Sequence, residues 1–157
     1  MKKILFLLFV AVIGVTFLTS TFQTACAADK KITIAEMKGK VEVKAAGTTS
    51  WKLAKWAMRL GPGDTVRTGA GSYADLSFNG MAQTALVRVE AGSEMEIETF
   101  QTSKLMKRRK ILLDLAIGEV LVKANKLKED SQFQVRTPTS IVGVRGTGFK
   151  VKVSAEK

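Results

Sequence analysis

A glycine-rich stretch near the C-terminus, residues 144–148 (V-R-G-T-G), has the composition of a loop that cradles a phosphate. Such a loop binds the anion because backbone N–H groups at the start of a following helix point at it. The next residues, 149–153, instead alternate apolar and polar side chains, which is typical of a strand. We interpret the glycines as permitting a tight bend, with Arg145 donating to backbone carbonyls that the bend leaves open. We expect the same of Arg67 and Arg136.

Three carboxylates, Glu94, Glu96 and Glu98, recur at every second position and share one face of a predicted strand. Grouped carboxylates could serve acid–base chemistry or bind calcium. Side chains two positions apart on a strand are separated by about 6.5–7 Å, which is loose for one shared ion. We therefore interpret these residues as a solvated outer face opposite lysines.

The sharpest charge feature is a basic run between residues 104 and 110. It is either a contact for an anionic surface or partner, or a solvated hairpin loop between the strands around Ile97 and Leu113. No aromatic side chains are interleaved for base stacking, so nucleic acid is disfavoured. The candidate contact residues are Lys104, Lys107, Arg108, Arg109 and Lys110.

Catalytic signatures are missing from the sequence. It contains no histidine, the commonest general base and metal ligand, and neither a nucleophile elbow nor an S-x-x-K pattern. We therefore assign no catalytic residue, cofactor or metal ligand, and we predict that the protein is not an enzyme. Trp51, Trp56 and Tyr73 could stack on sugar rings, but we expect them to close the end of a β-core.

Short runs of alternating apolar and polar residues recur along the chain, separated by glycine-containing turn signals. This pattern predicts an all-β fold: a single domain of short antiparallel strands, two-layered and either solenoid-like or sandwich-like. Residues 51–60 are compatible with a helical turn or an irregular strand. The predicted strands lie around residues 41–44, 74–79, 94–99, 111–117 and 149–154.

Two short patterns occur twice in the same order. Residues 39–44 (G-K-V-E-V-K) are similar to residues 118–123 (G-E-V-L-V-K), and the V-R-T triplet at 66–68 returns at 135–137. A repeated order of this kind suggests a duplicated strand–turn–strand element.

The N-terminus has the three parts of a secretory signal peptide. Two lysines precede an apolar run from Ile4 to Leu18, and Ala25-Cys26-Ala27 is an A-x-A cleavage signal. We expect a helical signal peptide at residues 1–27 and a mature domain at residues 28–157. Two alternatives remain: lipid modification of Cys26, which would make a lipoprotein, or an uncleaved anchor. We expect membrane contact only in these two cases.

The net positive charge of the chain indicates acidic partners. The chain has 25 basic and 14 acidic residues, and removing residues 1–27 takes away only two of the basic ones. For an exported protein, the acidic partners are lipid head groups, wall polymers and acidic protein faces rather than nucleic acid. We therefore expect a periplasmic or secreted protein whose partner is an envelope protein or an anionic envelope polymer.

The segment from Phe133 to Phe149 (F-Q-V-R-T-P-T-S-I-V-G-V-R-G-T-G-F) resembles the closing motif of the FecR domain. Upstream, an opening strand, a tryptophan, a G-D-x-I-R-T-G turn and an L-x-x-G-x-V strand pair resemble the family in the same order, so the resemblance spans residues 34–153. We expect structural roles for the matching positions, which are Gly39, Trp51, Gly63, Asp64, Arg67, Thr68, Gly118, Val135, Thr137, Pro138, Val144, Arg145, Gly146, Thr147 and Phe149.

The resemblance implies a fold and a periplasmic location. FecR proteins proper are transmembrane regulators whose cytoplasmic segment controls a sigma factor. We expect this chain to be a stand-alone exported FecR-like domain without that segment. The predicted function is a non-catalytic binding or sensing module that mediates protein–protein interaction in the cell envelope. The alternatives are a structural protein that binds anionic polymer or membrane through the basic run, and an accessory part of sigma-factor or outer-membrane transport signalling.

Overall fold

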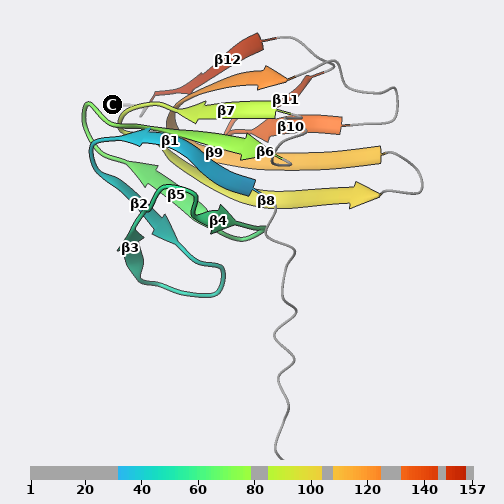
Figure 1. Ribbon diagram of the computed structural model, residues 1–157. Helices are drawn as coiled ribbons and strands as arrows, with labels where there is room; N and C mark the ends of the chain where they lie inside the picture. Colours follow the sequence, from blue (N-terminus) through green and yellow to red (C-terminus); the bar gives the residue numbers. More distant parts are fainter. Residues whose placement is uncertain (1–31, 79–84, 104–107, 125–131, 145–147, 155–157) are drawn as a thin grey trace, which may run out of the picture.

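The computed structural model describes residues 32–78, 85–103, 108–124, 132–144 and 148–154. All regular secondary structure in these ranges is β-strand (Figure 1). The predicted all-β class is therefore confirmed. The expected signal peptide, with Cys26 and the cleavage site, lies outside the described residues. Within the described ranges, no helix has the length and apolarity needed to cross a membrane. The strands are β1 (Ile32–Lys38), β2 (Val41–Lys44), β3 (Trp51–Leu53), β4 (Arg59–Leu60), β5 (Thr65–Thr68), β6 (Tyr73–Phe78), β7 (Ala85–Val89), β8 (Glu94–Ser103), β9 (Arg108–Ala124), β10 (Gln132–Arg136), β11 (Ile141–Val144) and β12 (Gly148–Val153).

Alternation of side chains places one face of each strand in the core. In β2, Val41 and Val43 are buried while Glu42 is half-buried on the other face. Strand β6 departs from this pattern, because Asp75 and Ser77 on its outer face are buried as well. Asp75 is covered by Arg88 of the neighbouring strand β7, whose Nε and Nη2 atoms each donate to the carboxylate at 2.7 Å.

All twelve strands belong to one hydrogen-bonded sheet that curls around the core (Figure 1). The central order is β3-β2-β5-β8-β9-β7-β6-β1-β4, and β10 and β12 both pair with β9. Two expectations need correction. The two predicted layers are halves of one continuous sheet, and the strands are not all antiparallel, because β10 runs parallel to β9 with Val135 opposite Leu113.

Strand β9 joins the two halves of the sheet. Its first part pairs with β8, its second part pairs with β7, and Gly118 lies between them at φ +98°. The Oγ atom of Ser93 accepts a hydrogen bond from the N–H of Glu119 at 2.9 Å and holds the chain after this glycine. A Cβ atom at Gly118 would lie 2.5 Å from the Cα atom of Ser93, so only glycine fits at this bend.

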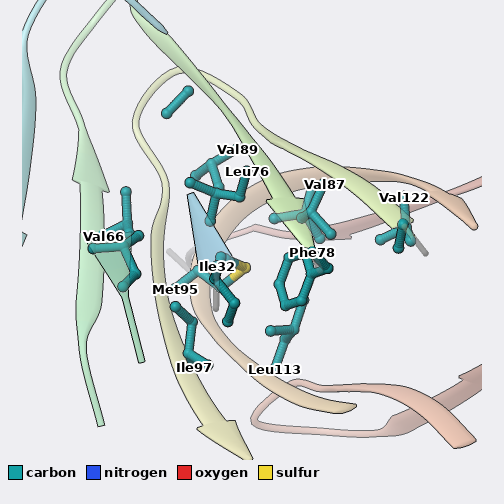
Figure 2. Close-up of a cluster of buried hydrophobic side chains, with 14 of the residues drawn as sticks. Ile32, Val66, Leu76, Phe78, Val87, Val89, Met95, Ile97, Leu113 and Val122 are labelled. Carbon is teal, nitrogen blue, oxygen red and sulfur yellow. The ribbon is translucent and has the colours of Figure 1, made fainter. Parts of the chain in front are cut away.

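The core combines aliphatic side chains with several phenylalanine rings, and Figure 2 shows Phe78 among the aliphatic residues. Phe78 and Phe133 are fully buried, and their ring centroids lie 6.1 Å apart in an edge-to-face arrangement. Phe100 contacts Phe78 in the same way at 5.9 Å, and the half-buried Phe149 contacts Phe133 at 6.4 Å. Edge-to-face pairs of this kind stabilise a core beyond the burial of their area.

The repeated sequence patterns share local geometry but not strand pairing. Gly39 resembles Gly118: it also has positive φ, and the next N–H, that of Lys40, donates to a serine, Ser72, at 2.9 Å. The strands that follow are paired differently, however. Strand β2 pairs with the V-R-T strand β5, whereas β10 pairs with residues 110–114 of β9 rather than with residues 118–123. The predicted duplicated strand–turn–strand element is therefore wrong as a pairing unit.

Candidate interaction surfaces

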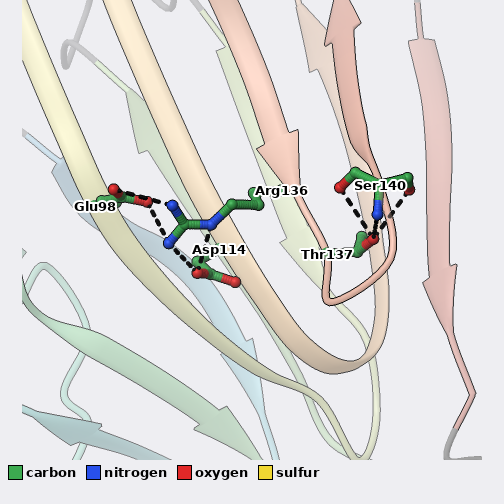
Figure 3. Close-up of polar contacts among 5 residues, drawn as sticks. All are labelled: Glu98, Asp114, Arg136, Thr137 and Ser140. Atoms are coloured by element: carbon green, nitrogen blue, oxygen red, sulfur yellow. Dashed lines mark hydrogen bonds and ion pairs between the residues drawn. The ribbon is translucent and has the colours of Figure 1, made fainter.

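The closing motif forms a hairpin, β10–β11, with a tight turn held by Thr137 (Figure 3). The Oγ1 atom of Thr137 accepts a hydrogen bond from the N–H of Ser140 at 3.0 Å, and the N–H of Thr137 donates to the Ser140 carbonyl at 2.8 Å. Pro138 is exposed in the turn, where its missing N–H costs no hydrogen bond. The strand break expected at Thr137-Pro138 is confirmed.

Arg136 binds carboxylates instead of the backbone carbonyls that we expected. Its guanidinium contacts Asp114, and its Nη2 atom lies 2.7 Å from Oε2 of Glu98 (Figure 3). The hydrogen bond to Asp114 is the main cause of the raised pKa of Arg136. The expectation that the glutamates at 94–98 face lysines is also wrong for Glu98, which pairs with this arginine. These contacts fasten β10 to β9 and β8 on the outer face of the sheet.

Arg67 repeats this arrangement at the other V-R-T triplet. Its Nη2 atom donates to Oε2 of Glu42 at 2.8 Å, and this hydrogen bond is the main cause of the lowered pKa of Glu42. The guanidinium also lies over the ring of Trp51, with its central carbon 4.1 Å from the ring centroid. Trp51 thus packs beneath a cation on the outer face and does not close the core, which corrects that expectation.

The buried turn residues of the motif have structural roles. Thr68 Oγ1 accepts a hydrogen bond from the N–H of Ser93 at 3.1 Å, and Asp64 accepts two backbone N–H groups, each at 2.9 Å. Gly63 has φ +84°, which favours glycine at this turn. Val135 is fully buried. Arg145, Gly146 and Thr147 lie outside the described residues, and for Val144 the structure describes only the backbone.

Strand β11 presents a free edge within the described part of the chain. It pairs with β10 alone, and the turn bond between Thr137 and Ser140 sets the pairing so that the N–H and C=O groups of Ile141 and Gly143 point away from β10. The Ile141 side chain is 64% exposed. The strand reads I-V-G-V and carries no charge that would oppose pairing with another strand.

The basic run is only partly a loop. Arg108, Arg109 and Lys110 belong to β9, paired with residues 101–103 of β8, so the expected hairpin loop is shorter than residues 104–110. Lys110 is exposed, but the structure does not describe the side chains of Arg108 and Arg109, and Lys104 and Lys107 lie outside the described residues. Anion binding by this run stays a prediction.

Residues 51–59 (W-K-L-A-K-W-A-M-R), called here the 51–59 segment, join the two ends of the central strand order, β3 and β4. This stretch is a short strand, a turn and a short strand, so the helical alternative is wrong. Trp56 is 74% exposed and Leu53 is 66% exposed. The expectation that Trp56 closes the core is therefore also wrong. The sequence signal that could have identified this segment as a charged surface is its low content of acidic residues, which we did not use.

Tyr73, the third aromatic side chain expected at the core end, is half-buried beneath Arg88 and donates to Oε1 of Glu36 at 2.6 Å. The hydrogen bond to Glu36 raises its pKa above the ordinary value, because ionisation removes the donated proton beside a carboxylate. The bond is therefore intact at neutral pH and is lost as the pH rises through the raised pKa of Tyr73.

We predict that Glu36→Gln lowers the pKa of Tyr73 toward 10.0, its ordinary value. The chain has one tyrosine, so phenolate absorbance during a pH titration reports this residue alone. Glu96→Gln, at an exposed position on another strand, is the control and is expected to leave the midpoint unchanged. An equal midpoint in wild type and Glu36→Gln would contradict the prediction.

Among the described residues, no cluster of three or more histidine, cysteine, aspartate or glutamate side chains is arranged to hold a metal ion. The polar groups that come together are instead cross-strand ion pairs and turn hydrogen bonds. The described surface offers two features for a binding partner, which are the free edge of β11 and the 51–59 segment.

Comparison with solved structures gives a match to a proposed anti-sigma factor from Parabacteroides distasonis. The two chains are 25% identical with a TM-score of 0.45, and the match covers 59% of this chain and 39% of the other. This chain therefore spans well under half of that protein. A search of curated proteins gives no match.

A family comparison matches residues 64–157 to the FecR protein family. The match begins at Asp64, so the family positions that we expected at Gly39, Trp51 and Gly63 lie before it. It includes the V-R-T strand β5, the bend at Gly118 and the complete closing motif from Phe133 to Phe149. Because the match covers more than half of the chain, this protein belongs to the FecR family.

Proposed function

We propose that this protein is a non-catalytic binding module of the cell envelope that engages a partner protein by strand addition at β11. The single observation that carries the proposal is the free edge of β11, on which Ile141 is exposed and the backbone groups of two residues point outward. An incoming strand pairs with such groups through main-chain hydrogen bonds, while exposed side chains such as Ile141 provide specificity.

Membership of the FecR family supports this proposal, because the edge strand lies within the family's closing motif. A role in regulatory signalling is consistent with the same membership. The apolar N-terminus with its A-x-A signal supports export, with cleavage after Ala27 and a periplasmic or secreted location. In this proposal the cross-strand pairs of Arg136 with Asp114 and Glu98 hold the β10–β11 hairpin rigid, so that little entropy is lost on binding.

The binding prediction concerns two substitutions on the edge strand. Ile141→Lys places a charge where a partner strand would lie, and Gly143→Pro removes an outward N–H without removing a bond to β10. We expect each variant to bind the partner roughly tenfold more weakly or worse, as for other central interface residues. Thr139→Lys, which adds the same charge on the exposed turn, is the matched control.

The measurement is retention of envelope proteins by the immobilised exported protein, combined with a photo-crosslinking residue at position 141 or 139. The proposal predicts one protein that is crosslinked from position 141, is not crosslinked from position 139, and is lost in both edge variants. Equal retention by wild type, Ile141→Lys and Gly143→Pro would overturn it. Thermal unfolding of each variant verifies that the fold is intact.

A further inference from the structure

The 51–59 segment has an inner side that packs on the core and an outer side that faces solvent. Ala54 and Met58 are half-buried against the core, while the five side chains of the outer set, Lys52, Leu53, Lys55, Trp56 and Arg59, are all exposed. An exposed tryptophan and leucine among cations is the composition of a surface that contacts the interface of a membrane, where amphipathic aromatic rings lie at head-group level.

The local charge is positive. Residues 43–63 contain four cationic side chains and no carboxylate. One of them, Lys44, lies 5.1 Å from the centroid of the Trp51 ring. The other three, which are Lys52, Lys55 and Arg59, have no carboxylate partner among the described residues. Cations that are free in this way remain available to phosphate groups.

Backbone hydrogen bonds of the segment are made within the protein. The N–H of Ala54 donates to Val41 at 2.9 Å, the N–H of Ala57 donates to Ile34 at 3.0 Å, and the carbonyl of Met58 accepts from the N–H of Ile34 at 3.0 Å. Nε1 of Trp56 donates to the carbonyl of Ala35 at 3.2 Å, which fixes the ring. Groups that are already paired lose little on leaving water, so these parts of the turn can approach a membrane interface at low cost, while the outward N–H of Leu53 on the end strand β3 stays available to a lipid oxygen.

We propose that the 51–59 segment docks the protein on an anionic lipid bilayer, with Trp56 and Leu53 at the level of the head groups and Lys52, Lys55 and Arg59 on lipid phosphates. Leu53 favours lipid over glycan, because an aliphatic side chain gains more from an acyl environment than from a sugar face. The segment lies before the residues matched to the FecR family and on strands other than β11. The site is therefore independent of the partner-binding edge.

The first experiment is co-sedimentation of the exported protein with two kinds of vesicle. One contains phosphatidylcholine with phosphatidylglycerol, and the other contains phosphatidylcholine alone. We expect binding to the anionic vesicles only, weakened by salt. The triple variant K52Q/K55Q/R59Q is expected to bind roughly 100-fold more weakly. Each Lys or Arg near an anionic surface makes a similar contribution to the binding free energy, and this variant removes three of them. Trp56→Ala is expected to reduce binding roughly tenfold.

The matched control is K38Q/K123Q/K152Q, which removes the same charge from exposed positions on β1, β9 and β12. It is expected to change binding much less than the first triple variant. Equal losses in the two triple variants would show that net charge alone drives binding, and would overturn the proposal. Absence of vesicle binding, or equal binding to both kinds of vesicle, would also overturn it.

Fluorescence gives a second readout that does not depend on sedimentation. The chain has two tryptophans, so Trp51→Phe leaves Trp56 as the only indole emitter. We expect a blue shift on addition of anionic vesicles and quenching by brominated lipid. An unshifted, unquenched Trp56 would exclude insertion. The edge variants Ile141→Lys and Gly143→Pro should bind vesicles as wild type does, so failure of this proposal and failure of the proposed protein binding are distinguishable.

Discussion

Gly118→Ala is expected to lower the free energy of unfolding by about 3–4 kcal/mol, the larger of the two stability effects predicted here. The new Cβ atom would lie 2.2 Å from Oγ and 2.5 Å from Cα of Ser93. Since one of these is a backbone atom, a rotamer change cannot relieve the contact. Strain from positive φ adds about 1–2 kcal/mol to an overpacking cost of about 1–3 kcal/mol.

Chemical denaturation measures this effect as a lower midpoint with an unchanged m-value. Gly92→Ala is the matched control. Gly92 directly precedes Ser93 and also has a positive φ, +65°, but a Cβ atom there would have nothing within 4 Å. It is expected to cost only the backbone strain, about 1–2 kcal/mol. Equal losses in the two variants would contradict a steric origin for the effect at Gly118.

Asp64→Ala is expected to cost about 3 kcal/mol. The carboxylate is 1% exposed, its Oδ1 atom accepts the N–H of Ala46, and its Oδ2 atom accepts the N–H of Gly61. Alanine leaves both donors without this acceptor, and hydrogen bonds to a charged group are worth about 1.5–3 kcal/mol each. The turn also bonds β8, through the N–H of Gly63 and the carbonyl of Ile97 at 2.7 Å, so its loss would loosen that strand.

The same denaturation measurement tests Asp64→Ala against Asp64→Asn. Asparagine keeps one acceptor oxygen and turns an amide donor toward the other N–H, so it is expected to recover less than half of the loss. Glu96→Gln, at an exposed carboxylate, is expected to change stability by less than about 0.5 kcal/mol. A loss below about 1 kcal/mol in Asp64→Ala would show that the turn does not depend on these bonds.

Some of this arrangement was predictable from local sequence. The alternation in β2 and β12 identified the core side of these strands, and Thr137-Pro138 predicted the end of β10. The G-D and V-R-T residues were expected to have structural roles, but the carboxylate partners of Arg67 and Arg136 were not predicted. These features depend on neighbours within a few positions, since the side-chain period of a strand and the φ preference of glycine are local properties.

Surface properties were not predictable in this way. The sequence suggested that Trp56 closes the core, but whether a side chain is covered depends on which distant strand lies above it. The edge of β11 is another example, because a strand of four residues gives no indication of how many partners it has. Arg136 and its partner Glu98 are separated by 38 residues, and only their strands' common neighbour, β9, brings them together.

The sequence by itself determined that this protein is an all-β member of the FecR family, which side of strands such as β2 and β12 is buried, and that Thr137-Pro138 ends β10. The tertiary structure decided that two apparent layers are one curled sheet, that β10 runs parallel to β9, and that Trp56 and Ile141 face solvent. The reason is physical: side-chain alternation fixes the face of a strand locally, whereas pairing and exposure are set by contacts between residues far apart in the chain.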